Sequence, residues 1–391
     1  MTTEGSWEAV VEKAATTSPD ARAWREAFLA VPRDTFIPET IWHANPDGAG
    51  YVSLTKTEDP SRWRDLVQSD SYVITQVDDG ATSPGRIGRR ISSSSSMPTV
   101  MAVMLGDVGI QDGDRVLEIG TGTGYNTALL CHRLGADMVT SVEIDPMVAD
   151  HARHALAVAG FTPTVITADG TGGYPAHAPY GRVLATAAVT QVPYAWVNQT
   201  RSGGTIVTPW GTRLLNSSLL RLTVAPDGTA SGHFVDHAAF MRLRDQRLGD
   251  WLPRPEQYPD AVAGTTALHP YHPVGDDVGG AFAVSVLLPE LEKSITYHDA
   301  ERTAYELLIF HDETRSWATV TVTPQASSAR RFPVRQHGPR NLWTEVEAAH
   351  IWWVHHHRPS YTQFGLTVTP TGQHVWLDHP DQPVSGDGRC S

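Results

Sequence analysis

Residues 116–130 read VLEIGTGTGYNTALL, and this stretch decides the fold. An apolar run leads into glycines at alternate positions, Gly120, Gly122 and Gly124, and a helical apolar pattern begins directly after them. Glycine permits a sharp bend from strand to helix and lets a ligand approach the backbone closely. The dinucleotide spacing G-x-G-x-x-G is absent, because its third glycine would be Tyr125 or Thr127. The stretch therefore predicts a buried strand, a ligand-binding turn and a helix.

Apolar strands and helices alternate around this turn. The patterns predict strands over residues 114–120, 138–144, 162–169, 180–188 and 203–211, and helices over 97–109, 125–135 and 145–160. Ser96 is the predicted N-cap of the helix over 97–109, and Pro98 lies in its first turn. Such alternation is typical of a parallel sheet with helices on both faces, so we expect an α/β doubly wound, Rossmann-like domain.

Two acidic side chains follow the next strands of this predicted sheet. Glu143 ends a strand about twenty residues after the glycine turn, where an acid can reach a ribose diol, and Asp145 is the expected cap of the next helix. Asp169 ends a third strand and either binds an adenine amine or forms an ordinary Asp-Gly turn. The E-x-G-x-G-x-G turn with these acids is typical of enzymes that bind S-adenosylmethionine.

Composition narrows the class of protein. The 391 residues carry a formal net charge of −13, with 30 Lys and Arg against 43 Asp and Glu, so nucleic acid is not the expected partner. The sequence has neither a basic leader before an apolar run nor a long uncharged stretch, which argues against a membrane and favours the cytoplasm. The two cysteines cannot form a disulfide framework, and consecutive His355, His356 and His357 point in different directions on a helix, so no metal site is expected.

The regions before and after the predicted sheet differ in pattern. The helical spacing of apolar residues over 6–32 predicts a helix. Residues 33–95 are less regular and end in a Gly-, Arg- and Ser-rich stretch that predicts either a linker or an ordered binding loop. Beyond residue 244, the runs 281–288, 305–312, 316–324, 364–372 and 374–378 predict strands, and 342–357 predicts a helix. We therefore expect an N-terminal substrate-side region (1–95), a cofactor-binding core (96–225) and a mainly β accessory domain (245–391).

Several segments together resemble the protein L-isoaspartyl O-methyltransferases, over about residues 20–212. They are VPRDTFIP (31–38), SSSSSMPTVMAVML (92–105), LEIGTGTGY (117–125), SVEID (141–145), TADGTGGYP (167–175), APYGRVLATAA (178–188) and VPYAWVNQTRSGGTIVTPWG (192–211). The first two are more specific to that family than the glycine turn is. The resemblance implies S-adenosylmethionine as methyl donor and a carboxylate of a peptide or protein as acceptor.

The resemblance also implies which residues form the site. It gives Ser96 and Ser94 as the catalytic candidates and Ser95, Ser96 and Met97 as the acceptor-binding ones. The donor-binding candidates are Glu118, Gly120, Thr121, Gly122, Gly124, Tyr125, Glu143, Ile144, Asp169 and Gly170. If Ser96 only caps a helix, its hydroxyl has no role toward the acceptor.

The sequence departs from the family pattern where we expect the acceptor. Ser95 replaces an isoleucine, Gly181 replaces an acidic residue, and the segment 40–71 is longer than usual. Similar C-terminally extended relatives modify ribosomally made peptides such as lanthipeptides and graspetides. The six tryptophans after residue 244, with Arg330, Arg331, Arg335 and Arg340, predict either a peptide-binding surface or core packing.

Three functions are consistent with this sequence. The favoured hypothesis is methyl-esterification of an aspartate in an already cyclised or crosslinked precursor peptide, which leads to aspartimide or isoaspartate. The alternatives are repair of isoaspartyl proteins and a non-catalytic peptide-binding scaffold that retains the cofactor fold. The intact glycine turn, Glu143 and Asp169 argue against the scaffold.

Overall fold

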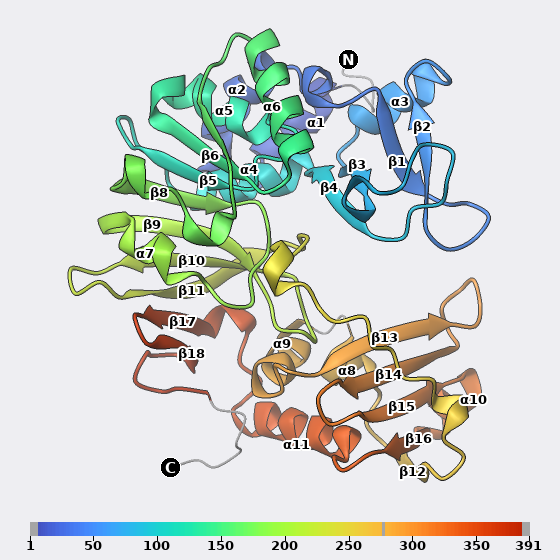
Figure 1. The fold of residues 1–391 in the computed structure, drawn as a ribbon. Coiled ribbons are helices and arrows are strands. Elements are labelled where there is room, and N and C mark those ends of the chain that lie inside the picture. The colour runs from blue at the N-terminus through green and yellow to red at the C-terminus, as the bar shows by residue number, and fades with distance from the viewer. Residues whose placement is uncertain (1–6, 276–277, 385–391) are drawn as a thin grey trace.

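The computed structural model describes residues 7–275 and 278–384, which form three β-sheets with helices between and around them (Figure 1). The largest sheet has nine strands in the order β18-β17-β11-β10-β9-β8-β5-β6-β7. The strands of this sheet that come first in the chain are β5 (Val116–Ile119), β6 (Val139–Glu143), β7 (Thr164–Thr167), β8 (Tyr180–Ala185) and β9 (Thr200–Trp210). These five strands pair in parallel, which confirms the predicted α/β doubly wound class.

Helices cover one face of the parallel strands and build the first hydrophobic core. They are α1 (Trp7–Ala15), α2 (Arg25–Ala30), α4 (Pro98–Asp107), α5 (Tyr125–Leu134) and α6 (Pro146–Val158). Strand β5 is buried along its whole length because helices or strands cover both of its faces. The opposite face packs on Trp196 of α7 (Tyr194–Asn198). The glycine turn therefore directly follows a fully buried strand, which fixes its position.

The N-terminal helical pattern is divided in the structure, so the predicted continuous helix over residues 6–32 is wrong. Helix α1 ends at Ala15, and the chain restarts as the 3₁₀ helix η1 (Ala21–Trp24) and then α2. The Thr16 and Thr17 hydroxyls donate to the carbonyls of Lys13 and Ala14 and so compete with continued helix formation. Pro19 supplies no backbone N–H in the intervening turn.

A separate four-stranded sheet occupies the N-terminal side, with the order β2-β1-β3-β4. Its strands are β1 (Thr40–Ala44), β2 (Tyr51–Thr55), β3 (Val73–Val77) and β4 (Ile91–Ser95), and α3 (Pro60–Val67) packs against it. The serine run thus forms an edge strand. This answers the choice between a linker and an ordered loop, because residues 91–95 pair with β3.

The main sheet continues as an antiparallel sheet on the side of β9. Strands β10 (Ser218–Val224) and β11 (Ala230–His237) follow β9, and much later in the chain β17 (Phe364–Thr369) and β18 (Gly372–Leu377) join the edge of β11. The last strands of the C-terminal region are therefore part of the sheet that carries the glycine turn (Figure 1).

The remaining C-terminal residues form a five-stranded antiparallel sheet in the order β12-β16-β15-β14-β13. Its strands are β12 (Val262–Thr266), β13 (Glu292–Tyr297), β14 (Tyr305–His311), β15 (Ser316–Val322) and β16 (Phe332–His337). Its helices are α8 (Tyr271–Val274), α9 (Val278–Leu287), α10 (Pro324–Ala329) and α11 (Leu342–His355). The predicted helix over 342–357 is confirmed within one turn.

Helices α9 and α11 form a layer shared by the two larger sheets. Phe282 and Trp353 pack into the core of the nine-stranded sheet, whereas Val284 and Trp343 pack into the core of the five-stranded sheet. The predicted strand over 281–288 is wrong, because this run forms α9. A helix buried on all sides is apolar all round, and its sequence has no period that separates it from a buried strand.

In the described ranges, no helix is long and apolar enough to cross a membrane.

Asp107, the last residue of α4, has a side chain that should lower the stability of the fold. Its Oδ2 atom is buried and has no hydrogen-bond partner among the described residues, and burial together with the nearby Asp236 raises the pKa of Asp107 to about 6. An acid whose pKa is raised by folding stabilises the folded state below its unfolded pKa, and this contribution is lost as the pH rises through about 6.

We therefore expect Asp107→Asn to increase the free energy of unfolding by about 1–2 kcal/mol near pH 8 and to change it little near pH 4. Urea denaturation at the two pH values measures the effect. Asp112→Asn is the control, since the Asp112 side chain is 84% exposed. An equal effect of Asp107→Asn at both pH values would contradict this account of Asp107.

Candidate active site

A cavity of about 540 Å³ lies at the carboxyl ends of the parallel strands. Most of its lining comes from the turns after β5, β6, β7 and β8, the residues of β4 with Ser96 and Met97, and residues 239–244 with Arg247, which follow β11. Tyr72 and the α4 residues Val100, Met101 and Met104 also line it. Ligands of doubly wound sheets bind at this edge. A volume of this size is within the range of cofactor pockets, about 300–1,000 Å³.

The three glycines of the turn have different surroundings. Gly120, Gly122 and Gly124 all have positive φ, at 93°, 54° and 86°. A Cβ on Gly120 would lie 2.8 Å from Thr186 Oγ1, and one on Gly124 would lie 3.3 Å from Ala152 Cβ. At Gly122 the nearest atom would be the Ser94 carbonyl oxygen at 3.6 Å. Gly120 and Gly122 line the cavity, whereas Gly124 packs against α6 outside the lining.

Glu143 lies at the end of β6 with its carboxylate beside the glycine turn. Its Oε2 accepts from the Gly122 N–H at 2.9 Å and its Oε1 accepts from the Asp145 N–H at 3.1 Å. Burial raises the pKa of Glu143, while the two backbone donors oppose the shift. The carboxylate lines the cavity and fixes the glycine turn relative to β6.

Glu118, a predicted donor-binding residue, is not among the residues that line the cavity. It is completely buried on β5 and accepts hydrogen bonds from the side chains of Asn126, Thr127 and Ser141. Burial raises its pKa, and the three donors oppose the shift. Glu118 therefore joins β5, β6 and the start of α5 from beneath the turn.

The remaining predicted donor-side residues meet at the cavity. Thr121, Tyr125, Ile144, Asp169 and Gly170 all line it. Asp169 is exposed, and its Oδ1 accepts from the Thr171 N–H at 2.9 Å, so the ordinary turn contact is present at the cavity edge. The Tyr125 ring packs against Phe36, and its hydroxyl is buried without a partner among the described residues.

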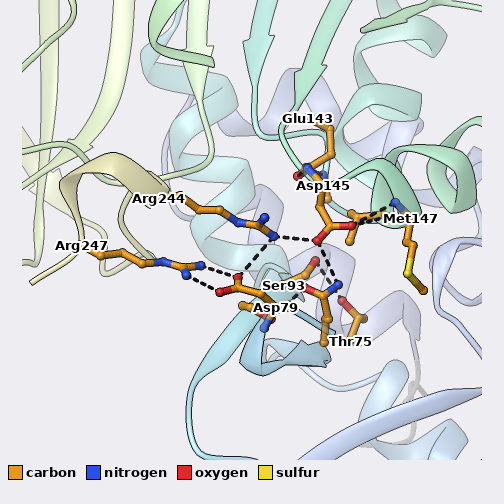
Figure 2. A network of polar contacts seen from close by, with 12 residues as sticks. Thr75, Asp79, Ser93, Glu143, Asp145, Met147, Arg244 and Arg247 are labelled. Carbon is orange, nitrogen blue, oxygen red and sulfur yellow. Dashed lines mark hydrogen bonds and ion pairs between the residues drawn. The ribbon is translucent and has the colours of Figure 1, made fainter. Parts of the chain in front are cut away.

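Asp145 caps α6, as predicted, and also joins an ion-pair network (Figure 2). Its Oδ1 accepts from the N–H groups of Met147 and Val148, and its Oδ2 lies 2.7 Å from Arg244 Nη2. Burial acts to raise the pKa of Asp145, but Arg244 and the backbone donors outweigh it and hold the pKa below its usual value. The Asp145 carboxylate that caps α6 is thus ionised and is held in place by Arg244, which is far away in the sequence.

The same network connects the segment after β11 to the N-terminal sheet. Arg244 also lies 3.3 Å from Asp79, and Arg247 donates to both carboxylate oxygens of Asp79 at 2.7 and 2.9 Å (Figure 2). Gln76 donates to Asp145 and accepts from the Ser92 hydroxyl. The Gln76 side chain therefore links Ser92 of the serine strand to Asp145.

The serines of β4 alternate between two environments. Ser93 and Ser95 are buried, and their hydroxyls accept from Thr75 and Arg33. Ser94 and Ser96 are half-buried and line the cavity, and neither hydroxyl has a protein partner among the described residues. Two hydroxyls without a partner among the described residues therefore lie at the cavity, that of Ser94 on β4 and that of Ser96 directly after it. Ser93 and Ser95 also line the cavity, but their hydroxyls are engaged by Thr75 and Arg33.

Ser96 is not the N-cap of α4, so that prediction is wrong. The cap position is Met97, which makes no side-chain cap hydrogen bond. Asp70 has the capping role, because its Oδ1 accepts from the Thr99 N–H and the Thr99 hydroxyl, each at 3.0 Å. A carboxylate from another segment satisfies the helix N-terminus and leaves the Ser96 hydroxyl available.

Sequence reasoning missed the wall formed by residues 239–247 and the contribution of Thr186 and Ala187. The first lies beyond the predicted core and has no motif, although its arginines at alternate positions, 242 and 244, were a detectable signal. Gly181, expected on the acceptor side, lies at the opposite end of β8, where a Cβ would be 2.3 Å from Asp114 Oδ1. That departure from the family pattern reflects packing.

Most of the C-terminal tryptophans, together with Arg335 and Arg340, are engaged within the fold, whereas Arg330 and Arg331 are exposed. Trp317, Trp343, Trp353 and Trp376 are buried, and Trp251 and Trp352 are partly buried. Arg340 is paired with Glu290 and Glu345. The arginine at 335 donates to backbone carbonyls of Pro255 and Tyr258. Core packing, the alternative in the sequence, accounts for most of these aromatic residues.

The histidines of α11 show no metal arrangement. His356 stacks on Trp352, and His357 has a positive φ of 62° after the helix end. In the described part of the chain, no group of three or more His, Cys, Asp or Glu side chains is placed to hold a metal ion.

Comparison with known proteins agrees with this geometry. Residues 71–248 match the family described as protein-L-isoaspartate(D-aspartate) O-methyltransferase. A protein-L-isoaspartate O-methyltransferase of Thermococcus onnurineus is 37% identical over 222 residues, which are 56% of this chain and 84% of that protein. One from Methanoculleus marisnigri is 47% identical over 119 residues, 30% of this chain and 53% of that protein.

The fold extends this similarity beyond the matched sequence. A solved structure titled protein-L-isoaspartate O-methyltransferase superposes with a TM-score of 0.53 and 20% identity, covering 95% of this chain and 99% of that one. The C-terminal region therefore has a counterpart in the fold of that protein, although the sequence match ends near residue 248.

Proposed function

The chain belongs to the protein-L-isoaspartate(D-aspartate) O-methyltransferase family, and from that premise we propose that it methylates the free carboxylate of an isoaspartyl residue in a peptide or protein. One observation carries the proposal: the glycine turn with Glu143 lines the same cavity as two serine hydroxyls that have no hydrogen-bond partner within residues 7–275 and 278–384. A donor and an acceptor bound at these two sets of residues would be adjacent.

The donor side fits S-adenosylmethionine, the methyl donor of this fold. Glu143 would accept hydrogen bonds from the ribose hydroxyls, and Asp169 with Gly170 would lie at the adenine, because each follows a parallel strand at the cavity edge. Gly122 supports this assignment, since no side chain at that position fills the space beside Glu143. When bound, the donor supplies an electrophilic methyl group on a sulfonium.

The acceptor side needs positioning more than acid–base chemistry. A carboxylate is ionised at neutral pH, because its usual pKa is about 4, so no general base is required. The hydroxyls of Ser94 and Ser96 would donate to it and hold one oxygen in line with the methyl group. Alignment of this kind supplies a large part of the acceleration in a displacement reaction.

The walls of the cavity would limit access of water. Residues 239–247 line one side and are tied to the N-terminal sheet by Arg244 and Arg247. A water-poor site favours a reaction in which the negative acceptor and the positive donor lose their charges together, because both ionic reactants are stabilised by water.

A second candidate function is tailoring of a specific peptide at an ordinary aspartate. It is favoured by the segment 40–71, which forms β1, β2 and α3, and by Ser95 in place of the family isoleucine. Strands β1 and β2 belong to the same sheet as the serine strand and are separated from it by β3. The C-terminal region no longer distinguishes the two functions, because a protein titled as an isoaspartate methyltransferase has a similar fold over nearly its whole length.

Matched peptides that differ only in isoaspartate or aspartate at one position test the two functions. We expect transfer of labelled methyl to the isoaspartyl peptide with kcat/KM at least about 100-fold above the aspartyl peptide, a difference of about 3 kcal/mol in transition-state binding. The reverse preference, seen with a cyclised peptide and followed by loss of methanol, would favour tailoring. No transfer to either peptide, with intact donor binding, would favour the non-catalytic scaffold.

A further inference from the structure

Arg33 is the charged centre of the VPRDTFIP segment, and the proposed chemistry does not use it. The side chain is almost completely buried, at 2% exposure. Among the described residues, no carboxylate accepts a hydrogen bond from its guanidinium, in contrast to most buried cations. The question is therefore what compensates for burying the charge of Arg33 without a hydrogen-bonded carboxylate.

The guanidinium is satisfied almost entirely by backbone carbonyls from two segments. Nη1 and Nη2 donate to the carbonyls of Val67, Ser69 and Ser71 at 2.9, 3.1 and 2.9 Å. Nη2 also donates to the carbonyls of Ser95 and Ser96 at 3.2 and 2.9 Å, and Nε donates to the Ser95 hydroxyl at 3.3 Å. One planar group therefore holds the end of the serine strand where Ser94 and Ser96 line the cavity.

The other end of Arg33 is anchored to the donor side. Arg33 begins the 3₁₀ helix η2 (Arg33–Phe36), and the fully buried Phe36 packs on Tyr125 with ring centroids 5.6 Å apart. Tyr125 is the first residue of α5, directly after the glycine turn. The Phe36 carbonyl also contacts His151 Nε2 of α6 at 3.2 Å. A short rigid path thus joins the glycine turn to the serine strand through Arg33.

The energetic balance argues against packing as the main role. Burial lowers the pKa of Arg33 to about 10, which measures the unfavourable environment of the charge. Apolar residues of similar volume commonly replace buried charges without loss of stability. An arginine differs from them in its fixed planar set of donors, which defines the relative position of every carbonyl it binds.

We propose that Arg33 is a positioning residue for methyl transfer, which sets the serine strand at a fixed distance from the glycine turn so that the Ser94 and Ser96 hydroxyls meet the acceptor carboxylate. This inference rests on the proposed methyl transfer. It concerns the acceptor alone, because no Arg33 atom lines the cavity. Arg33 should consequently affect acceptor kinetics and leave donor affinity nearly unchanged.

Arg33→Lys in the full chain is the test, and Arg182→Lys is its matched control. Arg182 is also buried and donates to the carbonyls of Gly109 and Gly181, and unlike Arg33 it pairs with a carboxylate, Asp114, at 3.3 Å. These contacts lie at the opposite end of β8 from the cavity. Both variants should lower the Tm. Comparison at one temperature below both transitions separates loss of position from loss of stability.

We expect Arg33→Lys to lower kcat/KM for the isoaspartyl peptide about 10- to 100-fold, because small misplacements of reacting groups have effects of this size. The Kd of S-adenosylhomocysteine, measured by calorimetry, should change less than about twofold, and Arg182→Lys should retain the kcat/KM of the parent. Retained kcat/KM in Arg33→Lys, or an equal loss in Arg182→Lys, would overturn the positioning role. Loss of donor affinity equal to the loss of kcat/KM would also overturn it.

A second variant tests the proposal if Arg33→Lys does not fold. Ser95→Ala removes only the hydroxyl that accepts from Arg33 Nε, since that hydroxyl has no other protein partner among the described residues. Acceptor kcat/KM should fall about two- to fivefold at constant donor Kd, because the lost contact is long, at 3.3 Å, and the hydrogen bonds of Arg33 to backbone carbonyls remain. An unchanged kcat/KM in Ser95→Ala would then overturn the proposal. Absence of methyl transfer in the parent protein would instead contradict the proposed function.

Discussion

The Ser94→Ala/Ser96→Ala double variant should lose about 10²- to 10³-fold in kcat while its affinity for S-adenosylhomocysteine stays within about twofold of the parent. The reason is geometric. Both hydroxyls line the cavity and have no partner in the part of the chain that the structure describes, whereas Glu143 and the glycine turn, which we assign to the donor, are not altered by the change. Steady-state kinetics with a saturating isoaspartyl peptide and calorimetry with the donor product measure the two quantities.

Ser93→Ala is the matched control for this prediction. Ser93 directly precedes Ser94 on the same strand, but its hydroxyl is buried and contacts Thr75. It should lower stability slightly and retain turnover. Full activity of the double variant would remove the serines from the acceptor site, and an equal loss in Ser93→Ala would assign the effect to distortion of the strand.

Gly122→Val should raise the Kd of the donor at least about 100-fold, which corresponds to about 3 kcal/mol. A side chain here would occupy the space between Glu143 and the Ser94 carbonyl, and a β-branched residue is also unfavourable at a φ of 54°. Isothermal titration with S-adenosylmethionine and with S-adenosylhomocysteine gives the affinity directly.

Gly135→Val separates the two causes. Gly135 follows the last residue of α5, the helix that begins after the glycine turn, and has a φ of 87°. A Cβ on Gly135 would meet no atom within 4 Å, so a valine there strains the backbone without obstructing the cavity. It should lower the Tm and leave the donor Kd unchanged. Normal donor affinity in folded Gly122→Val would show that the ligand does not approach the turn at this position.

The parallel core and much of the site could be predicted because their signals are local in sequence. The glycine turn, the Asp145 cap and the acids that follow consecutive strands each occupy a few adjacent residues, and parallel topology brings the strand ends together. The fold class followed from the alternation of strands and helices. Glu118, by contrast, was placed at the ligand from a motif that does not specify on which face of the strand its side chain lies.

The incorrect predictions concern contacts between segments that are far apart in the chain. Ser96 has the sequence context of an N-cap, but Asp70, in the turn between α3 and β3, has that role. The segment 239–247 closes the cavity through ion pairs to Asp79 and Asp145, which no local pattern indicates. The same limitation applies to α9. Because this helix is buried between two sheets, apolar residues occupy all of its faces, and its sequence has no helical period.

The late pairing of β17 with β11 has a consequence for biosynthesis. Residues 364–377 are made more than a hundred residues after β11, so the growing chain displays β11 as an open strand edge while the five-stranded sheet is still emerging from the ribosome. Open edges pair readily with other chains. The nascent protein should therefore need a chaperone during this interval, and chains that stall before residue 364 should aggregate although the whole glycine-turn region has already been synthesised.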